Sequence, residues 1–386
     1  MTKTPLTLLI ALSLAACATS STATAPTTLQ ASRRSVRGEE FRVLATTTSG
    51  AGDAYDASML FERASQALRA QRCDEAISLY DRLIREFPDN SRVPTAQFNR
   101  GQCLQRLERL PEAADAMRAA SHAPRDPELS RDALFRVAVL GDRAQRPEWI
   151  LEATEALLAR GDLSLSDRTE ALARRAAALL SQHLFDDAER TAQQAITLAP
   201  TPESVAALGD DTYAAEARVV LAEVFRGRAS EVVYRVEDPT AEDAITRRVQ
   251  LVTHAHVLFN DAIRAGNPHW AAAAGFHIGE MYSDLYHSIV DAPTPADWDA
   301  PAREIYRRRT GDRLRPLLQG ALRSWEATLS MARRNGISDN EWVRRAGEAL
   351  EALRSLITGE ERPSTRPAVT PAPPGAPAPA TVRPSA

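Results

Sequence analysis

A period of 37 residues constrains the fold of this chain more than any other feature. The tripeptide Asp-Glu-Ala at 74–76 is echoed by Pro-Glu-Ala at 111–113 and by Asp-Asp-Ala at 186–188. The first interval is 37 residues and the second is 75, which leaves room for one degenerate copy between them. A fixed period of roughly 20 to 50 residues is typical of stacked repeat units. In each copy we predict two helices and a short turn, with helices over 57–70 and 74–87 in the first copy.

Small residues stand where the two helices of each copy are expected to cross. They let helix backbones approach closely, and a proline then ends the second helix because it cannot continue the hydrogen-bond ladder. The degenerate third copy departs from this pattern, because Ile150 takes the small position of its second helix. The small residues are Ala64, Gly101, Ala138 and Ala176 in the first helices and Ala76, Ala113 and Ala188 in the second, and the prolines are Pro88, Pro124 and Pro200.

This pattern resembles the tetratricopeptide repeat (TPR). The resemblance implies an all-α fold, a TPR-like helical-hairpin solenoid that coils into a right-handed superhelix and holds peptides or proteins on its concave side. We expect a regular TPR array of about four repeats over 55–205. Divergent repeats with insertions are expected over 206–358, where a final helix at 339–357 would cap the stack, as solenoids require.

Two of the divergent copies are predicted to be split by insertions. The first insertion is expected over 227–242, and the second is about 30 residues long. Each insertion would separate a first helix from the second helix that packs on it. The first helices carry Ala222 with Phe225 and Gly279 with Tyr282, and their partners carry Ala255, Phe259 and Ala262 and then Ala321, Trp325 and Thr328.

The start of the chain has the layout of a secretory signal, with Lys3 followed by an apolar run over 6–16. This run is about half of the roughly 20 residues that a membrane-spanning helix needs. It ends in Leu-Ala-Ala before Cys17, which resembles the lipobox of bacterial lipoproteins. The resemblance implies a lipoprotein signal peptide over 1–16, with a diacylglycerol on the sulfur of Cys17 and an acylated amine. An ordinary signal peptide with a chance cysteine at its end is the alternative.

The segments that flank the predicted repeats differ from them in composition. Ala18 stands where an aspartate retains many lipoproteins in the inner membrane, so the resemblance implies a lipid anchor in the outer membrane, facing the periplasm. Residues 17–54 are rich in Ser, Thr and Ala, and we expect a lipidated flexible tether because so little apolar surface is available for burial. The Pro- and Ala-rich segment 359–386 predicts a disordered tail.

Composition and motifs give no support to several classes of function. The net charge of −4 provides no case for a nucleic-acid partner. No lysine follows Lys3, so none is available as a Schiff base or as a phosphate ligand. The sequence contains no GxSxG, no HExxH and no phosphate-binding glycine loop. We therefore expect no enzyme activity, no cofactor and no small-molecule substrate.

Two charged clusters leave alternatives open. The segment 303–315 holds six arginines, which would meet lipid A phosphates or an acidic partner, or would form a solvated helix face. The other cluster lies on one face of a predicted helix and would either bind zinc or be the solvated face of that helix; three helical turns are too long for one tetrahedral ion. Its members are His277, Glu280, Asp284 and His287.

Cys73 and Cys103 remain if lipid occupies Cys17. Cys73 falls in the turn before the second helix of the first copy and Cys103 in the adjacent first helix of the second copy, in a compartment that would permit a disulfide. A disulfide between them and a pair of independent buried thiols both fit the sequence, since unpaired cysteines pack well in helical cores.

Two rows of residues repeat with the same 37-residue period. Each Arg follows its Phe by eight residues, so the two side chains lie on the same side of every first helix. By resemblance to the TPR, these positions line the concave groove, where Arg can grip a carboxylate with two hydrogen bonds. The alternative is an inter-repeat core for the Phe row and a solvated edge for the Arg row. The rows stop at the fourth copy, with Ala173 and Ser181, so the site is expected in the N-terminal copies. The Phe row is Phe61, Phe98 and Phe135, and the Arg row is Arg69, Arg106 and Arg143.

Together these features predict a non-enzymatic periplasmic TPR scaffold, anchored in the outer membrane, that binds an envelope protein or peptide through its concave groove. The first two copies are similar to periplasmic repeat proteins of envelope assembly, and residues 279–356 are similar to those of gliding machinery. The alternative is an envelope-remodelling or metal-dependent hydrolase that uses the divergent C-terminal half.

Overall fold

The computed structural model describes residues 56–198 and 212–358. Within these ranges it contains thirteen α-helices and no strand, which confirms the predicted all-α class. The predicted signal peptide over 1–16, the lipid site at Cys17, the tether over 17–54 and the tail over 359–386 lie outside the described residues.

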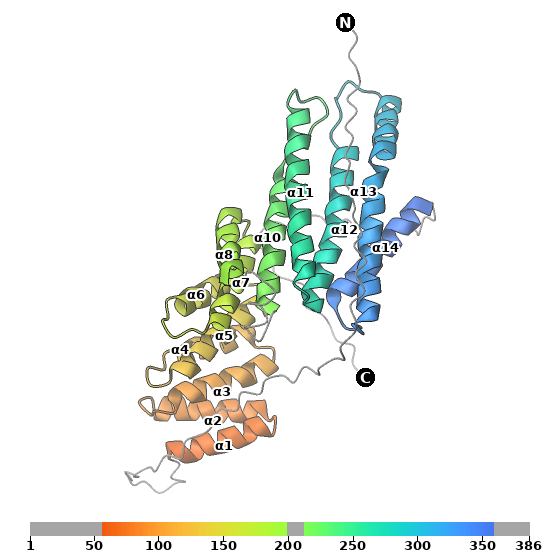
Figure 1. The fold of residues 1–386 in the computed structure, drawn as a ribbon. Helices are drawn as coiled ribbons and strands as arrows, with labels where there is room; N and C mark the ends of the chain where they lie inside the picture. Colours follow the sequence, from red (N-terminus) through yellow and green to blue (C-terminus); the bar gives the residue numbers. More distant parts are fainter. Residues whose placement is uncertain (1–55, 199–211, 359–386) are drawn as a thin grey trace. The chain divides into compact units, whose positions relative to one another are not determined.

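The first eight helices form four helical hairpins, as the period of 37 residues predicts (Figure 1). Each helix packs against the next in sequence, and the first helices α1, α3 and α5 also contact one another in order. The first helices therefore lie side by side, which is the condition for a shared binding surface. The hairpins are α1 (Ala57–Arg69) with α2 (Cys73–Glu86), α3 (Val93–Arg106) with α4 (Leu110–Ser121), α5 (Pro127–Arg143) with α6 (Pro147–Leu158), and α7 (Leu165–Ser181) with α8 (Phe185–Leu198).

The predicted small residues are buried where the helices of each hairpin cross. A Cβ atom added to Gly101 would lie 2.8 Å from the terminal methyl of Met117, so the missing side chain makes room for that methionine. The third hairpin reaches the same closeness although its second helix has a large residue at the small position. Ile150 is the large residue on α6, and Gly141 on α5 receives it, because a Cβ at Gly141 would lie 2.8 Å from Cγ1 of Ile150.

The four turns inside these hairpins share one backbone geometry. In the first, the amide of Arg72 donates to the carbonyl of Ala67 and that of Gln71 donates to Leu68, the paired bonds of a Schellman motif. Each turn places a non-glycine residue at positive φ, between 54° and 59°. These residues follow the repeat period, and they are Gln71, Glu108, Gln145 and His183.

The second half of the chain is built from longer helices. Here α10 packs on α7 and α8 as well as on α11, while α12 packs on α13 and α14 contacts both. The predicted second helices and the final helix are present at the expected positions. These elements are α10 (Thr212–Glu231), α11 (Ala241–Arg264), α12 (Pro268–Val290), α13 (Ala300–Arg334) and α14 (Glu341–Thr358).

The first predicted insertion overlaps the connection 232–240 between α10 and α11 but extends too far into both helices, and the second was wrong in its length. Gly227, predicted to open the first insertion, lies inside α10, and only residues 291–299 connect α12 to α13. The additional residues instead lengthen the helices, to 35 residues in α13. The cause at Gly227 is packing, because a Cβ there would lie 2.5 Å from Cε1 of Phe185, so the glycine admits the phenyl ring without breaking the helix.

The crossing of α12 and α13 depends on glycine. A Cβ atom at Gly279 would collide with the indole of Trp325, and one at Gly275 would collide with Thr328. The indole nitrogen of Trp325 donates to the carbonyl of Phe276 at 3.1 Å, which satisfies its only donor in the buried interface.

Candidate functional site

The structure places the predicted Arg row at equivalent points of three neighbouring helices. Arg69, Arg106 and Arg143 are the last residues of α1, α3 and α5, and all three are exposed. A cation at a helix C-terminus is stabilised by the helix dipole, so each position also has a structural benefit.

Two members of the Arg row bridge to the preceding repeat. Arg106 Nη1 donates to the carbonyl of Leu68 at 3.5 Å, and Arg143 Nη2 donates to both carboxylate oxygens of Glu108 at 2.7 Å. Arg69 belongs to the first hairpin, and among the described residues it forms no ion pair. The row therefore consists of two arginines with a structural partner and one without.

All three residues of the Phe row, Phe61, Phe98 and Phe135, are partly buried. Phe61 lies edge-on to Tyr80, with ring centroids 6.0 Å apart, and the guanidinium of Arg92 lies 5.4 Å from its centroid. Phe61 and Phe98 also pack against the buried core of the N-terminal hairpins. These two rings thus contribute to the inter-repeat core while part of each remains accessible.

A polar network holds the first two hairpins together beneath these rows. The hydroxyl of Tyr80, a fully buried residue, lies 3.1 Å from both Ser65 Oγ and Asn99 Nδ2, the latter a donor to it. Burial raises the pKa of Tyr80 above its usual value, so the phenol stays neutral. Arg100 adds an ion pair to Asp81 at 2.5 Å, which fixes α3 against α2.

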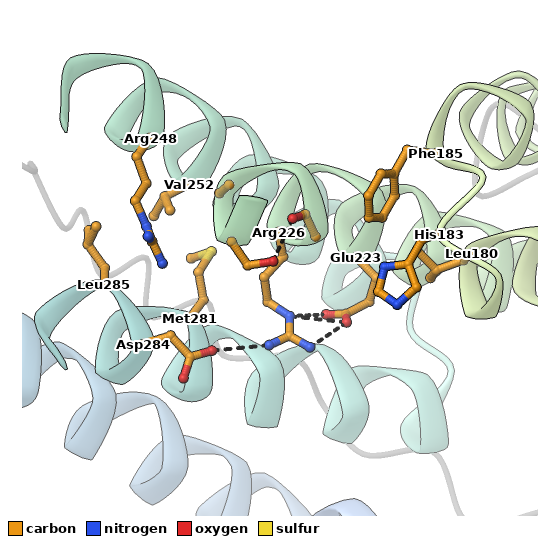
Figure 2. A pocket seen from close by; sticks show the side chains of 13 residues that line it. Leu180, His183, Phe185, Glu223, Arg226, Arg248, Val252, Met281, Asp284 and Leu285 are labelled. Carbon is orange, nitrogen blue, oxygen red and sulfur yellow. Dashed lines mark hydrogen bonds and ion pairs between the residues drawn. The ribbon is translucent and has the colours of Figure 1, made fainter. Parts of the chain in front are cut away.

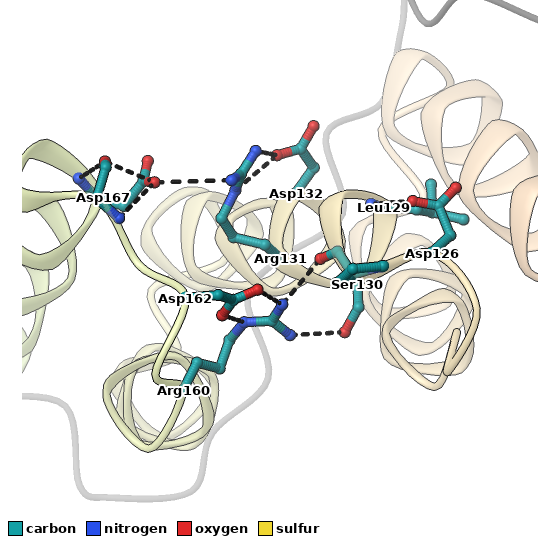
Figure 3. A network of polar contacts seen from close by, with 10 residues as sticks. Asp126, Leu129, Ser130, Arg131, Asp132, Arg160, Asp162 and Asp167 are labelled. Carbon is teal, nitrogen blue, oxygen red and sulfur yellow. Dashed lines mark hydrogen bonds and ion pairs between the residues drawn. The ribbon is translucent and has the colours of Figure 1, made fainter.

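A second network fixes the start of α5 (Figure 3). Arg160 donates to both oxygens of Asp162, to Ser130 Oγ at 3.1 Å and to the carbonyl of Pro127 at 2.9 Å. The guanidinium borders a cavity of about 470 Å³ that is lined by Ser121, His122 and neighbouring residues. Because Arg160 already has several partners, this network serves mainly to hold the loop after α6 against α5.

The structure also contains a pocket of about 220 Å³ that the sequence interpretation missed (Figure 2). Its side chains come from the α7–α8 turn and from α10, α11 and α12, so residues far apart in sequence meet there. Phe185, Val252, Met281 and Leu285 supply apolar surface. Arg226 crosses the pocket and joins Glu223, at 2.8 Å, to Asp284, at 3.2 Å.

This pocket lies where the Arg row would continue. Gly227 and Asp284 each stand five residues after the crossing residue of their helix, Ala222 and Gly279, as Arg69 stands five residues after Ala64. The exchange of arginine for glycine and aspartate concealed this register in the sequence. The first-helix positions that carry arginine in the N-terminal repeats therefore line a mixed-charge pocket in the C-terminal half.

The predicted histidine cluster does not assemble into a metal site. His277 Nδ1 lies 3.1 Å from Glu280 and 3.5 Å from Glu223, whereas His287 contacts Asp291. Within the two described ranges, no group of three or more His, Cys, Asp or Glu residues is arranged to hold a metal ion. The histidines pack against aromatic rings instead: the pairs His254 with Phe225 and His277 with Phe259 are stacked.

Cys73 and Cys103 are both buried and both free. Burial, together with a hydrogen bond to Cys73, raises the pKa of the Cys103 thiol to about 12. Only the thiolate attacks a disulfide or an alkylating reagent, so the raised pKa disfavours reaction of this thiol at neutral pH. In this structure the two thiols are unbonded but hydrogen-bonded to each other in the core, and the disulfide stays a prediction.

None of the helices described here is both long enough and apolar enough to cross a membrane.

Comparison with known proteins supports the repeat assignment. Residues 61–128 match the tetratricopeptide repeat family, which confirms the resemblance for this segment. No curated protein matches the chain.

Solved structures give a more distant likeness. A tetratricopeptide repeat protein from Parabacteroides merdae is 14% identical, with a TM-score of 0.37, and the match covers 77% of this chain and 98% of that one. A circular tandem repeat protein with a novel repeat topology is 15% identical, with a TM-score of 0.22, and the match covers 78% of both chains. At these TM-scores the likeness carries no argument about function.

Proposed function

We propose that this protein is a non-enzymatic scaffold that recruits an envelope protein or peptide through the first helices of its N-terminal repeats. In this proposal, a lipid on Cys17 holds the chain at the periplasmic face of the outer membrane. The observation that carries the proposal is the Arg row, three exposed guanidinium groups at the same point of α1, α3 and α5. We infer a partner segment with carboxylates spaced along it, because arginine binds carboxylates with two parallel hydrogen bonds.

The internal partner of Arg143 is compatible with this role. The Glu108 side chain is 70% exposed and that of Arg143 is 36% exposed. An exposed ion pair of this kind contributes only about 0–1 kcal/mol to stability. A carboxylate from a partner can therefore replace Glu108 with little loss of stability. The pair shows that Arg143 is placed to bind a carboxylate, and Glu108 does not prevent a partner from binding there.

Arg69 provides the sharpest test, because it forms no ion pair with another residue of 56–198 or 212–358. Arg69→Gln should reduce recovery of the partner by roughly fivefold or more, as expected for an interfacial arginine, and should lower the melting temperature by no more than a few degrees, since only the helix-dipole contribution is lost. The measurement is quantitative affinity capture from detergent-solubilised envelopes with the purified protein as bait, read by mass spectrometry. The triple variant R69Q/R106Q/R143Q should reduce recovery further.

Glu108→Gln is the matched control, since it releases Arg143 without removing any arginine. Partner recovery with this variant should equal or exceed that of the wild type. If R69Q and the triple variant both recover the partner normally while R106Q and R143Q lower the melting temperature, the Arg row serves only to join repeats.

A further inference from the structure

The N-terminal half of α13, residues 300–316, has an unusual concentration of positive charge. Its six arginines are all exposed, and only Glu304 and Asp312 oppose them, which leaves a net charge of +4. The six arginines are Arg303, Arg307, Arg308, Arg309, Arg313 and Arg315.

This half of the helix is docked firmly, so its outward face has a fixed direction. The hydroxyl of Tyr306 donates to the carbonyl of Ile289 at 2.9 Å, and a Cβ added to Gly311 would lie 2.9 Å from the hydroxyl of Tyr286. Pro316 lies inside the helix, and Leu317, directly after it, is the first buried residue of α13. The basic half therefore ends where the buried half begins.

The outward face combines free charge with an apolar side chain. Ile305 is 45% exposed, and Arg308 and Arg309 follow it by three and four residues, which places all three on one side of the helix. Neither arginine forms an ion pair with any other described residue, whereas Arg315 is held by Asp312 and Arg307 lies near Glu304.

Helix stability does not account for this charge. At the other end of α13, Arg333 and Arg334 lie in the last turn, where a cation is favoured by the helix dipole. Arg308 and Arg309 gain nothing from the dipole in the N-terminal half, and as neighbours they repel each other. These two guanidinium groups and the exposed isoleucine beside them do not stabilise the fold, but they match an external anionic surface.

We propose that this face of α13, formed by Ile305, Arg308 and Arg309, binds the phosphate groups of an anionic phospholipid membrane. Arginine pairs strongly with phosphate, and an apolar side chain beside it can enter the boundary between headgroups and acyl chains. The choice of a bilayer over an acidic protein rests on the proposed function, because a lipid on Cys17 would keep a membrane within reach of the chain.

The test uses the full mature chain with Cys17→Ala, so that no lipid contributes to binding. The protein is sedimented with phosphatidylcholine vesicles, with and without an equal amount of phosphatidylglycerol. It should bind the anionic vesicles alone and should dissociate at high salt, where screening shortens to about 3 Å. The double variant R308Q/R309Q should bind about 5- to 30-fold more weakly, since each arginine near such a surface contributes about fivefold.

The control R333Q/R334Q removes two adjacent arginines from the same helix and should bind like the wild type. R308K/R309K keeps the charge and should retain most binding, which guards against a folding defect in the glutamine variant. The proposal fails if the wild type does not bind anionic vesicles, or if both glutamine variants lose affinity equally. Loss of vesicle binding would leave the Arg row and its partner untouched, so the two proposals fail separately.

Discussion

At the scale of single residues, the four hairpin turns show how a repeat can tolerate local strain. Each turn needs left-handed backbone, which glycine adopts freely and which costs other L-residues about 1–2 kcal/mol. This chain uses glutamine, glutamate and histidine there, although it has glycine at positive φ in Gly266 and Gly336. The side chain is retained at some cost in stability, and in Glu108 it serves as the partner of Arg143.

Replacing such a residue by glycine should therefore stabilise the fold. Gln71→Gly should raise the free energy of unfolding by about 0.5–1 kcal/mol, because the turn geometry is kept and the strain is removed. Gln145→Gly should gain less, because it also loses the hydrogen bond from Gln145 Nε2 to the carbonyl of Asp142. The two gains should add, since the turns share no side-chain partners. Urea denaturation measures the change.

The matched control is Gln66→Gly, an exposed position within α1. It should lower stability by about 1 kcal/mol, as glycine does inside a helix. Destabilisation by Gln71→Gly of the same size would show that the left-handed geometry is not kept in solution.

At the scale of helices, the close crossing of α12 and α13 leaves no space for a side chain at Gly279. Gly279→Ala should destabilise the protein by about 1–3 kcal/mol or more, because the new methyl group collides with the indole of Trp325. Gly347→Ala on α14 is the comparison, since its Cβ would meet Leu329 Cδ2 only at an ordinary 3.9 Å. That variant should gain up to about 1 kcal/mol from helix propensity. Thermal unfolding of both decides whether space or propensity controls each site.

The sequence predicts the elements of the N-terminal half well because three signals agree there: period, small residues and proline. It places the later helix boundaries poorly, because a glycine can mark either the end of a helix or a close contact inside one. Gly227 was taken for the start of an insertion, yet it lies within α10 because the ring of Phe185 packs on it. Only knowledge of the neighbouring helix separates a break from a close contact.

The candidate site also has one part that the sequence predicts and another that it does not. The Arg row is visible in the sequence, since equal spacing puts equal residues at equal points of a repeat. The pocket around Arg226 is not visible in the sequence. Glu223 lies on α10 with Arg226, but Asp284 reaches it from α12, and no sequence motif links the two carboxylates. Nor can a sequence show that Arg143 already forms an ion pair with Glu108, which links the third repeat to the second.

At the scale of the whole molecule, the two largest buried clusters of the described helices meet at α7. One buried cluster reaches from Leu60 to Ala178, and a second runs from Ala176 to Leu353. Both draw on α7, so that helix connects the regular hairpins to the longer helices that follow. In a stack of this kind each repeat is stabilised mainly by its neighbours.

The proposed lipid anchor concerns the whole molecule and can be tested apart from both surfaces. Cys17→Ala should abolish incorporation of labelled palmitate, and a high-salt wash should then release the protein from the membrane fraction, because only the contact through α13 would remain. Metabolic labelling followed by envelope fractionation measures both. Retention of the palmitate label in this variant would contradict the assignment of Cys17.

The exchange between Gly141 and Ile150 has an evolutionary consequence. In the other hairpins a small residue stands on the second helix, but in the third the space has moved to the opposite side of the contact. A smaller residue at 150 would remove only part of the crowding at 141, because a Cβ there would still lie 3.0 Å from the carbonyl oxygen of Arg146 and 3.1 Å from Cβ of Trp149. Residue 150 is thus expected to vary more freely among descendants of this chain than the glycine at 141.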